Sequence, residues 1–568
     1  MSRHSAKATH GWRLNIVRAG FVLVVAGLLW RLVDIQILNN EFLRNQGDAR
    51  HLRNVPVVAH RGMILDRHGE PLAISTPVHS VWLNPQVTRA DSPNLDKVAN
   101  LLNVSLSGLQ EKIANYGKRE FVYIKRRITP ALAAQVKQLK VPGVALQREY
   151  KRYYPTAEVS AHMLGFTNID DVGQEGLELI YEPTLTGVPG LKRMIRDSRG
   201  NYVGGGEQIR AAKAGENLQI SMDLRLQYLT YNALKSAVKA HQAVGGTAVI
   251  VDVKTGEVLA MANQPAFNPN NRTGLRSSDF RNRAVTDLFE PGSTVKPFTV
   301  LSGLKSGLFD EQTIINTHPG VFRVSGHSIR DFRDYGEIDL ARLIQVSSNI
   351  ASSKIALELD PNDLWQDFAA FGLGSPTGGY FPGEAEGHLP DPRDWRKLDR
   401  ATLAYGYGLA TNALQLARAY AVIGNGGVLR DITFLKQDKP MPGRRVFASD
   451  LIGKVRKMME LTVQPGGTAT RAAVVNYRVA GKTGTVKKTS ATGGYTESEY
   501  QSVFAGLIPA SEPRLAMVVM VDSPGGDEYY GGAVAAPVFA EVMTGAMRLL
   551  NIAPDALPAD HLQMAGQS

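Results

Sequence analysis

One apolar stretch near the amino terminus constrains this chain more than any other part of its sequence. From Leu14 to Val33 the residues are predominantly apolar, and Arg18 and Arg31 lie near the ends, where long basic side chains can reach the membrane interface. A helix needs about 20 such residues to cross a bilayer. The segment before it carries only basic charges: Arg3, Lys7 and Arg13. By the positive-inside rule, the amino terminus is expected in the cytoplasm.

Two other interpretations of this stretch are open. A cleaved signal peptide is disfavoured because no Ala-x-Ala cleavage pattern follows the apolar run. A buried core helix is the second alternative. We favour an uncleaved transmembrane anchor at residues 14–39, with residues 1–13 on the cytoplasmic side. No second apolar run is long enough to return the chain, so the rest is expected outside the cytoplasm.

The composition is that of a globular protein with more than one domain. The sequence has 568 residues, 43% hydrophobic and 21% charged, which is too long for one ordinary core. Cysteine is absent, which excludes disulfides, thiolate nucleophiles and cysteine-bound metal. The net charge is +11, but the basic residues are scattered and no nucleic-acid motif accompanies them, so nucleic acid is not an expected partner.

Two regions follow the anchor. Residues 40–215 are turn-rich and weakly periodic, which predicts an irregular α+β module without a catalytic constellation. Between residues 216 and 552, strand patterns stand at both ends of a long helical middle, about 265 to 455. The predicted strands are GTAVIVDV, EVLAMAN, YRVAGKTGTVKK, SVFAGLIP and PRLAMVVMVD. We therefore expect one sheet built from both ends of this region, helices packed around it, and a frayed tail at 553–568.

The sequence FEPGSTVKPF, residues 289–298, contains the first candidate for chemistry. Its Pro-Gly pair permits a sharp turn, and Ser293 then opens a predicted helix whose free N–H groups and positive dipole end surround the hydroxyl. The spacing puts Lys296 on the same helix face. The pattern alone is weak, because a helix start with an incidental lysine has the same form. Ser-x-x-Lys also recurs at Ser236 and Ser302.

A lysine can act as a base at neutral pH only if its pKa falls well below the ordinary value. Burial and a second cation both have this effect. Lys482, in the predicted strand segment KTGT, is available as that cation, and Gly484 would let a ligand backbone approach the strand closely. The segment KTGE at 254–257 repeats the pattern, but it joins two predicted strands and is interpreted as a hairpin turn.

A third candidate lies in the sequence QVSSNIASSK. A predicted helix from Leu340 to Val346 stops here and another starts, so Ser347 and Asn349 are expected on an interhelical loop. Taken alone, these residues are better explained as an ordinary helix N-cap.

The three patterns together are more specific than any one of them. Ser-x-x-Lys is followed by Ser-x-Asn 51 residues after Lys296 and by Lys-Thr-Gly-Thr 133 residues after Asn349. This is the order found in penicillin-binding proteins and β-lactamases. The chain resembles class B penicillin-binding proteins, most closely division-specific transpeptidases of the FtsI type. The segments RGMILDRHG, RYYP and GQEGLE are similar to pedestal motifs of that family, and YGYGLATNALQLA and YYGGAVAAPVF to later landmarks.

The resemblance implies a fold and a mechanism. The fold would be α+β: an anchor helix, a pedestal (dimerisation) domain at 40–215, and at 216–552 a β-lactamase-like transpeptidase domain with a five-stranded antiparallel sheet flanked by helices. Ser293 would attack D-Ala-D-Ala of a peptidoglycan stem peptide, and Lys296 would accept its proton. The other implied roles are an oxyanion hole from the backbone N–H groups of Ser293 and Thr485, proton relay by Ser347, support of Lys296 by Asn349, and substrate binding by Lys482, Thr483, Gly484 and Thr485.

The same resemblance implies partners and a location. An amine from a neighbouring stem would resolve the acyl-enzyme, β-lactams would arrest it, and no metal or organic cofactor would be needed. An FtsW-type glycan polymerase and other division proteins would be partners at the bacterial inner membrane, with the catalytic domain in the periplasm. The alternatives are an elongation-type transpeptidase, a D-Ala-D-Ala carboxypeptidase or β-lactam-hydrolysing enzyme, and a β-lactam sensor.

Overall fold

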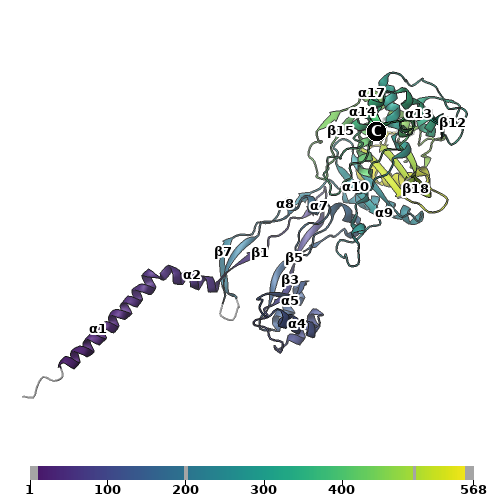
Figure 1. The fold of residues 1–568 in the computed structure, drawn as a ribbon. Coiled ribbons are helices and arrows are strands. Elements are labelled where there is room, and N and C mark those ends of the chain that lie inside the picture. Colours follow the sequence, from purple (N-terminus) through teal and green to yellow (C-terminus); the bar gives the residue numbers. More distant parts are fainter. Residues whose placement is uncertain (1–10, 197–201, 490–493, 557–568) are drawn as a thin grey trace, which may run out of the picture. The chain divides into compact units, whose positions relative to one another are not determined.

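The computed structural model of this protein describes residues 11–196, 202–489 and 494–556, which belong to two compact units (Figure 1). One unit takes its described residues from 1–60, 77–150 and 187–214. The other takes them from 61–76, 151–186 and 215–568. Each unit is therefore assembled from separate segments of the chain. The domain boundaries expected after residues 13, 39, 215 and 552 stay predictions.

The first unit begins with the expected apolar helix. Helix α1 (Gly11–Val33) continues into a π-helical turn at Asp34–Leu38, and together they form one helix of 28 residues that is long and apolar enough to cross a membrane. None of the residues of α1 is buried, which argues against a core helix. The helix therefore fits a single membrane anchor, and its orientation in the membrane stays a prediction.

The rest of the first unit is a small mixed structure. One part contains α2 (Asn40–His51) and an antiparallel sheet of β1 (Leu52–Val57), β6 (Gly190–Arg196) and β7 (Tyr202–Arg210). The other contains α3 (Leu95–Leu102), α4 (Leu106–Asn115), β4 (Val122–Ile128), α5 (Pro130–Gln138) and parts of β3 (Pro71–Leu83) and β5 (Val144–Tyr153). Val81, Leu102 and Val136 belong to one apolar cluster there. The irregular α+β module predicted from the sequence is confirmed.

Three of the predicted pedestal motifs meet in the second unit. Arg61, Arg152 and Glu178 come from RGMILDRHG, RYYP and GQEGLE, and all three side chains are buried. Arg61 Nη2 lies 2.6 Å from Glu178 Oε2, and Arg152 Nε lies 2.6 Å from Glu178 Oε1. A buried carboxylate is tolerated here because both of its oxygens are paired. The elements around this ion cluster are β2 (Ile64–Leu65), α6 (Ala161–Leu164), α7 (Gly176–Ile180), α8 (Glu182–Leu185) and β8 (Leu218–Gln219).

The core of the second unit is a five-stranded antiparallel sheet in the order β10-β9-β19-β18-β17. Its strands are β9 (Gly245–Asp252), β10 (Val258–Gln264), β17 (Ala480–Thr489), β18 (Tyr495–Ile508) and β19 (Leu515–Asp522). Two strands come from the start of the region and three from its end, as the apolar patterns predicted. Strand β17 lies at one edge of the sheet, which leaves it open to the helical part of the unit.

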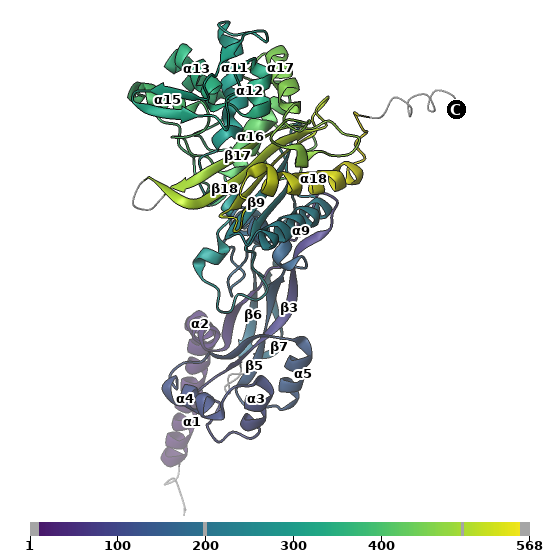
Figure 2. The ribbon, with the colours of Figure 1, turned by 90° about the vertical axis from the view of Figure 1, so that its right-hand side faces the viewer.

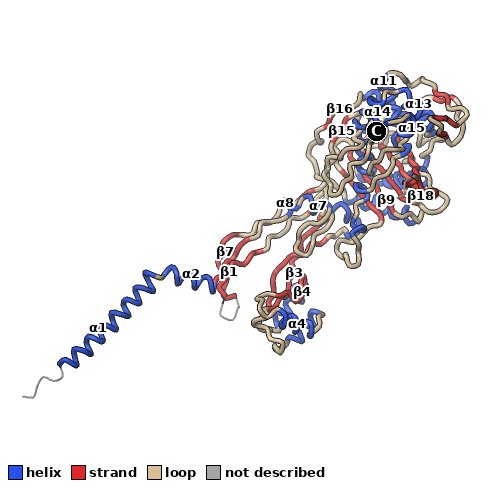
Figure 3. The backbone as a smooth tube through the Cα atoms, viewed as in Figure 1, coloured by secondary structure: helices blue, strands red, loops and turns tan. Residues whose placement is uncertain are grey.

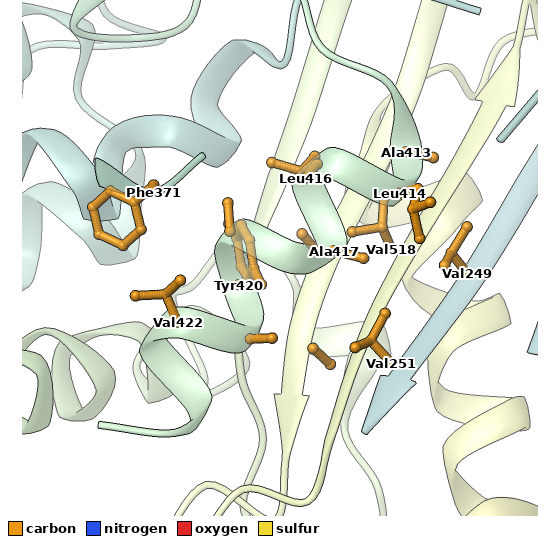
Figure 4. Close-up of a cluster of buried hydrophobic side chains, with 14 of the residues drawn as sticks. Val249, Val251, Phe371, Ala413, Leu414, Leu416, Ala417, Tyr420, Val422 and Val518 are labelled. Atoms are coloured by element: carbon orange, nitrogen blue, oxygen red, sulfur yellow. The ribbon is translucent and has the colours of Figure 1, made fainter. Parts of the chain in front are cut away.

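Helices cover both faces of this sheet, which explains why its inner strands are continuous apolar runs. The helices are α9 (Leu224–Ala240), α16 (Ala413–Gly424) and α18 (Gly531–Leu549). Figure 2 shows α9 and α18 on one face and α16 on the other. Leu414 and Ala417 of α16 lie toward Val249 and Val518 of the sheet (Figure 4). This packing fixes α16 and the sheet relative to each other.

The helical middle of the second unit is less regular than the sequence predicted (Figure 3). Its helices are α10 (Arg283–Thr286), α11 (Lys296–Ser306), α12 (Leu340–Val346), α13 (Asn349–Glu358), α14 (Pro361–Ala370), α15 (Lys397–Leu403) and α17 (Ser449–Glu460). Three short strand pairs interrupt it: β11 (Ile315–Asn316) with β14 (Glu337–Ile338), β12 (Val321–Val324) with β13 (His327–Arg330), and β15 (Val428–Arg430) with β16 (Gly443–Arg445). Strands this short carry too little alternation to be recognised from sequence.

Candidate active site

Ser293 lies in a tight 3-10 turn, not in the first turn of an α-helix as predicted. The turn covers Gly292–Val295, and α11 begins at Lys296 with Pro297 in its first turn, where the missing N–H has no helical partner to lose. Gly292 has φ +54°, a left-handed conformation that favours glycine. The Pro-Gly pair thus makes the sharp turn that the sequence analysis expected.

Neighbouring elements hold this serine turn (residues 292–295) in place. The Tyr420 hydroxyl of α16 donates to the Thr294 carbonyl at 2.8 Å, and Tyr420 is fully buried. The Gly292 N–H donates to the Gly406 carbonyl at 3.2 Å. A nucleophile on a fixed turn loses little orientational freedom when a substrate binds, which favours reaction.

Lys296 joins two of the three predicted motifs. Its side chain is fully buried. Its Nζ donates to the Ser347 carbonyl at 2.6 Å, to the Ser347 hydroxyl at 3.0 Å and to Asn349 Oδ1 at 2.8 Å. The ring of Tyr405 lies near the same nitrogen, 6.0 Å from centroid to Nζ. The structure therefore brings Lys296, Ser347 and Asn349 together.

The surroundings of Lys296 favour its neutral form. Burial lowers the pKa of Lys296 well below its ordinary value, and the positive charge of Lys482 lowers it further. The negative charge of Asp331 acts in the opposite direction and raises that pKa. Burial also lowers the pKa of Lys482 to about 7. The two conditions that the sequence analysis set for a basic Lys296, burial and a second cation, are both present.

The two Lys-Thr-Gly segments lie in different settings. Lys482 is fully buried on the edge strand β17. Lys254 lies in the turn between β9 and β10, is partly exposed, and pairs with Glu512 at 2.5 Å. On β17, the Thr483 hydroxyl donates to Thr468 Oγ1 at 2.9 Å. The segment KTGE at 254–257 is therefore a hairpin turn, as interpreted from the sequence.

Two glycines let β17 and the serine turn approach each other closely. A Cβ added at Gly484 would stand 2.9 Å from the Pro291 carbonyl oxygen and 3.1 Å from Thr294 Cγ2. A Cβ at Gly292 would overlap Val486 of β17. The backbone that lies close to Gly484 is that of Pro291, just before the serine turn. The expected approach of a ligand backbone to Gly484 stays a prediction. Thr485, next on the strand, accepts a hydrogen bond from the Gly531 N–H at 2.9 Å through its hydroxyl.

The second motif lies at a break between two helices, as predicted. Helix α12 ends at Val346, Ser347 adopts φ +63°, and α13 begins at Asn349. The N-cap of α13 is Ser348, whose hydroxyl accepts from the Ala351 N–H at 3.0 Å. The N-cap interpretation is therefore right for Ser348, and it leaves Ser347 and Asn349 to contact Lys296.

A cavity of about 380 Å³ is lined in part by Glu290, which precedes the serine turn in the chain, and by Gly408 and Lys487. Glu290 Oε1 accepts from the Gly408 N–H at 2.8 Å and from the Tyr495 hydroxyl at 3.2 Å. Burial raises the pKa of Glu290. Within residues 11–196, 202–489 and 494–556, no group of three or more His, Asp or Glu side chains is arranged to hold a metal ion.

Sequence reasoning missed several residues of this site. Tyr405 belongs to a segment quoted as a family landmark, but no role was assigned to it. Thr468 and Asp331 lie outside every recognised motif, and an isolated threonine or aspartate in a loop gives no sequence signal. Only the folded chain places them beside Thr483 and Asn349.

The comparison with protein families decides the identity of the fold. Residues 246–544 match the model described as penicillin binding protein transpeptidase domain, and residues 56–220 match that of the penicillin-binding protein dimerisation domain. The chain belongs to the penicillin-binding protein transpeptidases. The predicted class B penicillin-binding protein fold, with its pedestal, is confirmed.

Curated relatives of this penicillin-binding protein agree over nearly its whole length. It is 43% identical over 554 residues to the peptidoglycan D,D-transpeptidase FtsI of Escherichia coli K12, which covers 96% of this chain and 93% of the relative. It is 39% identical over 546 residues to the probable peptidoglycan D,D-transpeptidase PbpC of Pseudomonas aeruginosa, with 96% of each chain covered. The predictions of an enzyme of the D,D-transpeptidase type and of similarity to FtsI are confirmed.

Solved structures support the same assignment. The transpeptidase domain of Burkholderia pseudomallei penicillin-binding protein 3 is 39% identical, with a TM-score of 0.55, and covers 60% of this chain and 98% of that one. A peptidoglycan synthetase of Bifidobacterium adolescentis, at 24% identity, shares the fold with a TM-score of 0.71 over 89% of this chain and 98% of its own.

Proposed function

We propose that this penicillin-binding protein cross-links peptidoglycan stem peptides at the division septum, with Ser293 as its nucleophile. The observation that carries the proposal is the position of Lys296. This lysine follows Ser293 by three residues and is fully buried. It contacts Ser347 and Asn349, and the positive charge of Lys482 lowers its pKa. A buried lysine with a lowered pKa beside a serine is the arrangement needed for acyl transfer.

In the acylation step, Ser293 Oγ attacks the carbonyl carbon of the penultimate D-alanine, and its proton passes to neutral Lys296. The backbone N–H groups of Ser293 and Thr485 stabilise the negative charge that develops on the carbonyl oxygen. The close packing of the serine turn on β17 supports this pairing, because it brings the two segments that carry these N–H groups together.

The leaving group is the terminal D-alanine, whose nitrogen needs a proton as the amide bond breaks. Ser347 relays this proton from Lys296, a role supported by the 3.0 Å distance between Lys296 Nζ and the Ser347 hydroxyl. Lys482, Thr483 and Thr485 bind the terminal carboxylate of the donor. A carboxylate near Lys482 favours the protonated form of this lysine, whose pKa burial alone lowers to about 7.

An amine of a second stem peptide then attacks the acyl-enzyme carbonyl. Ser293 Oγ leaves and recovers a proton, and a new amide bond links the two stems. β-Lactams acylate the same serine and leave the enzyme blocked. In this proposal the anchor helix spans the inner membrane, the catalytic domain lies in the periplasm, and an FtsW-type glycan polymerase is a partner at the membrane. The apolar length of the helix supports the membrane location.

A partition experiment tests this function against the hydrolytic alternatives. The purified chain is given a stem-peptide thioester ending in D-alanine as donor, with and without an amine acceptor, and products are separated by mass. A transpeptidase forms the amide product in proportion to acceptor concentration. Free acid as the sole product at every acceptor concentration would identify a carboxypeptidase instead.

A further inference from the structure

Asp331 caps the helix that carries the second motif, although it lies outside all three motifs. It follows β13 in the chain and lies against the start of α13. Asp331 Oδ1 accepts from the N–H groups of Asn349 at 2.6 Å and Ile350 at 3.1 Å. Asp331 Oδ2 accepts from the Ser348 hydroxyl at 2.5 Å. One carboxylate thus contacts three consecutive residues at the helix start.

These contacts satisfy groups that the helix itself leaves free. The first N–H groups of an α-helix have no partner within the helix. In α13, Asp331 takes the N–H groups of Asn349 and Ile350, while Ser348 takes that of Ala351. A negative charge at a helix N-terminus is also favoured by the helix dipole. The start of α13 is therefore built by Ser348 and by a residue from a different loop.

The residue before Asp331 fixes the orientation of the Asn349 amide. Asn349 Nδ2 donates to the Arg330 carbonyl at 3.0 Å. A side-chain amide has one donor and one acceptor end, so this bond directs Oδ1 away from Arg330. Asn349 Oδ1 accepts from Lys296 Nζ at 2.8 Å. The segment 330–331 therefore determines both where Asn349 lies and which of its atoms meets the lysine.

We propose that Asp331 is a positioning residue for the reaction, acting through the helix start that holds Ser347 and Asn349 against Lys296. The proposal rests on the proposed role of Lys296 as the base. The hydrogen bonds of the Asp331 carboxylate go to Ser348, Asn349 and Ile350, not to Ser293 or Lys296. Its effect reaches Lys296 through Ser348 and Asn349.

The charge of Asp331 has a separate effect that makes the role testable. The charged and titratable groups that face Lys296 are Lys482 on β17, Asp331 after β13 and Tyr405 after α15. The pKa of Lys296 is lowered by Lys482 and raised by Asp331, and burial raises the pKa of Tyr405 to about 12, which keeps it neutral. Asp331 thus improves the geometry of Lys296 while its charge works against the neutral lysine.

Two substitutions separate these effects in the detergent-solubilised full-length chain, with the acylation rate by a labelled penicillin measured against pH. Asp331→Asn keeps the shape and one acceptor oxygen for the Asn349 and Ile350 N–H groups, but it removes the charge and the acceptor of the Ser348 hydroxyl. The acidic limb of the rate profile is therefore expected to shift to lower pH and the plateau rate to fall. Asp331→Ala removes the cap and is expected to slow acylation by about tenfold to about a hundredfold, since a displacement of about 1 Å in such a site has an effect of this size.

Asp360 provides a matched control. It caps α14, another helix of 10 residues, by accepting from the N–H groups of Asn362 at 2.8 Å and Asp363 at 3.4 Å. Asp360→Ala removes this cap and Asp360→Asn removes only its charge, and neither touches the motif, so both should leave the acylation rate and its pH profile unchanged.

The outcomes are distinct. Equal acylation rates for Asp331→Ala and Asp360→Ala would overturn the positioning role, and an acidic limb that stays in place in Asp331→Asn would refute the charge effect. If Asp331→Ala does not fold, the plateau acylation rate of Asp331→Asn decides, and a rate equal to that of Asp360→Asn would overturn the positioning role. A wild-type chain that penicillin does not acylate would refute the proposed function itself, which is a different result.

Discussion

At the residue scale, the site depends on two buried lysines, Lys296 and Lys482, that lie close enough for the charge of one to act on the other. Among the described residues, neither Lys296 nor Lys482 donates a hydrogen bond to an acidic side chain. Because each charged form is costly to bury, the pKa of each is lowered. Lys296 follows Ser293 by three residues, and Lys482 belongs to the proposed carboxylate-binding segment. Burial thus lowers the pKa of both lysines, although one is proposed as the base and the other as a substrate-binding residue.

The two Lys-Thr-Gly segments give the first prediction. Lys482→Ala should slow acylation by penicillin far more than Lys254→Ala, because Lys482 is buried near Lys296, whereas Lys254 pairs with Glu512 at the surface. Lys482→Arg should also acylate poorly, since a planar guanidinium does not replace a compact ammonium. Second-order acylation rates measure both effects. If Lys254→Ala slowed acylation as much as Lys482→Ala, the functional role of the segment KTGT would be contradicted.

The lowered pKa of Lys482 predicts how stability depends on pH. Between the folded pKa of about 7 and the ordinary value of 10.5, the unfolded chain binds more protons than the folded chain. The contribution of Lys482 to the free energy of unfolding therefore rises with pH through this window and is constant below it.

Denaturant unfolding at pH 7 and pH 9 checks this sign. The wild type should gain more stability between the two pH values than Lys482→Met, which has no titrating group at this position. Parallel changes in the two proteins would contradict the assigned pKa shift.

The residues of the site differ in how far sequence could predict them. Ser293, Lys296, Ser347, Asn349 and Lys482 fall into patterns whose order is specific. Asp331 and Thr468 carry no pattern, because their contacts with the motifs depend on loops that only the fold brings together.

At the element scale, the site is a contact between the edge strand β17 and the serine turn. Tyr420 of α16 holds the turn through its hydrogen bond to the Thr294 carbonyl. Strands β9, β10 and β19 could be predicted because both faces of the sheet are covered and their sequences are therefore mostly apolar. The 3-10 geometry of the serine turn could not, because it depends on packing against β17 and on the Gly406 carbonyl.

A methyl group at Gly484 tests this contact. Gly484→Ala should reduce acylation strongly, since the new Cβ meets the Pro291 carbonyl oxygen at 2.9 Å and forces the turn away from the strand. Gly453→Ala is the control, because Gly453 lies within α17 and a Cβ there meets nothing within 4 Å. The control should be stabilised by about 0.5–1 kcal/mol, the usual gain from replacing a helical glycine. Normal acylation by folded Gly484→Ala would contradict the packing argument.

At the scale of the whole molecule, the chain combines an apolar anchor helix with two compact units made from interleaved segments. Local sequence patterns predict the anchor helix and the strands of the catalytic sheet because each corresponds to an apolar run that is continuous in the sequence. They do not predict that residues 61–76 and 151–186 join the unit that contains the catalytic sheet, because this depends on long-range pairing such as that of Arg61 with Glu178.

The anchor gives a prediction that separates tethering from partner binding. A chain starting near Asn40 should bind penicillin as well as the full protein, because all the site residues lie beyond residue 290. If the helix also docks a membrane polymerase, an unrelated apolar span should anchor the enzyme but fail to support division. Helix pairing in lipid depends on small residues and close packing, here Gly20, Ala26 and Gly27, whereas spanning needs only apolar length.

Complementation of cells depleted of the native enzyme measures this effect. Failure of the unrelated span, with normal penicillin binding, is the expected result. Full rescue would reduce the helix to a tether and assign partner contacts to the pedestal.

The central claim is that Ser293 is the nucleophile, and mapping the penicillin adduct tests it most directly. The purified chain is incubated with labelled penicillin, digested, and analysed by mass. The adduct should map to Ser293, disappear in Ser293→Ala and persist in Ser236→Ala and Ser302→Ala. Loss of the serine nucleophile lowers kcat by about 10⁶ in a serine protease, so the result should be unambiguous. An adduct retained in Ser293→Ala, or found on Ser236 or Ser302, would contradict the account.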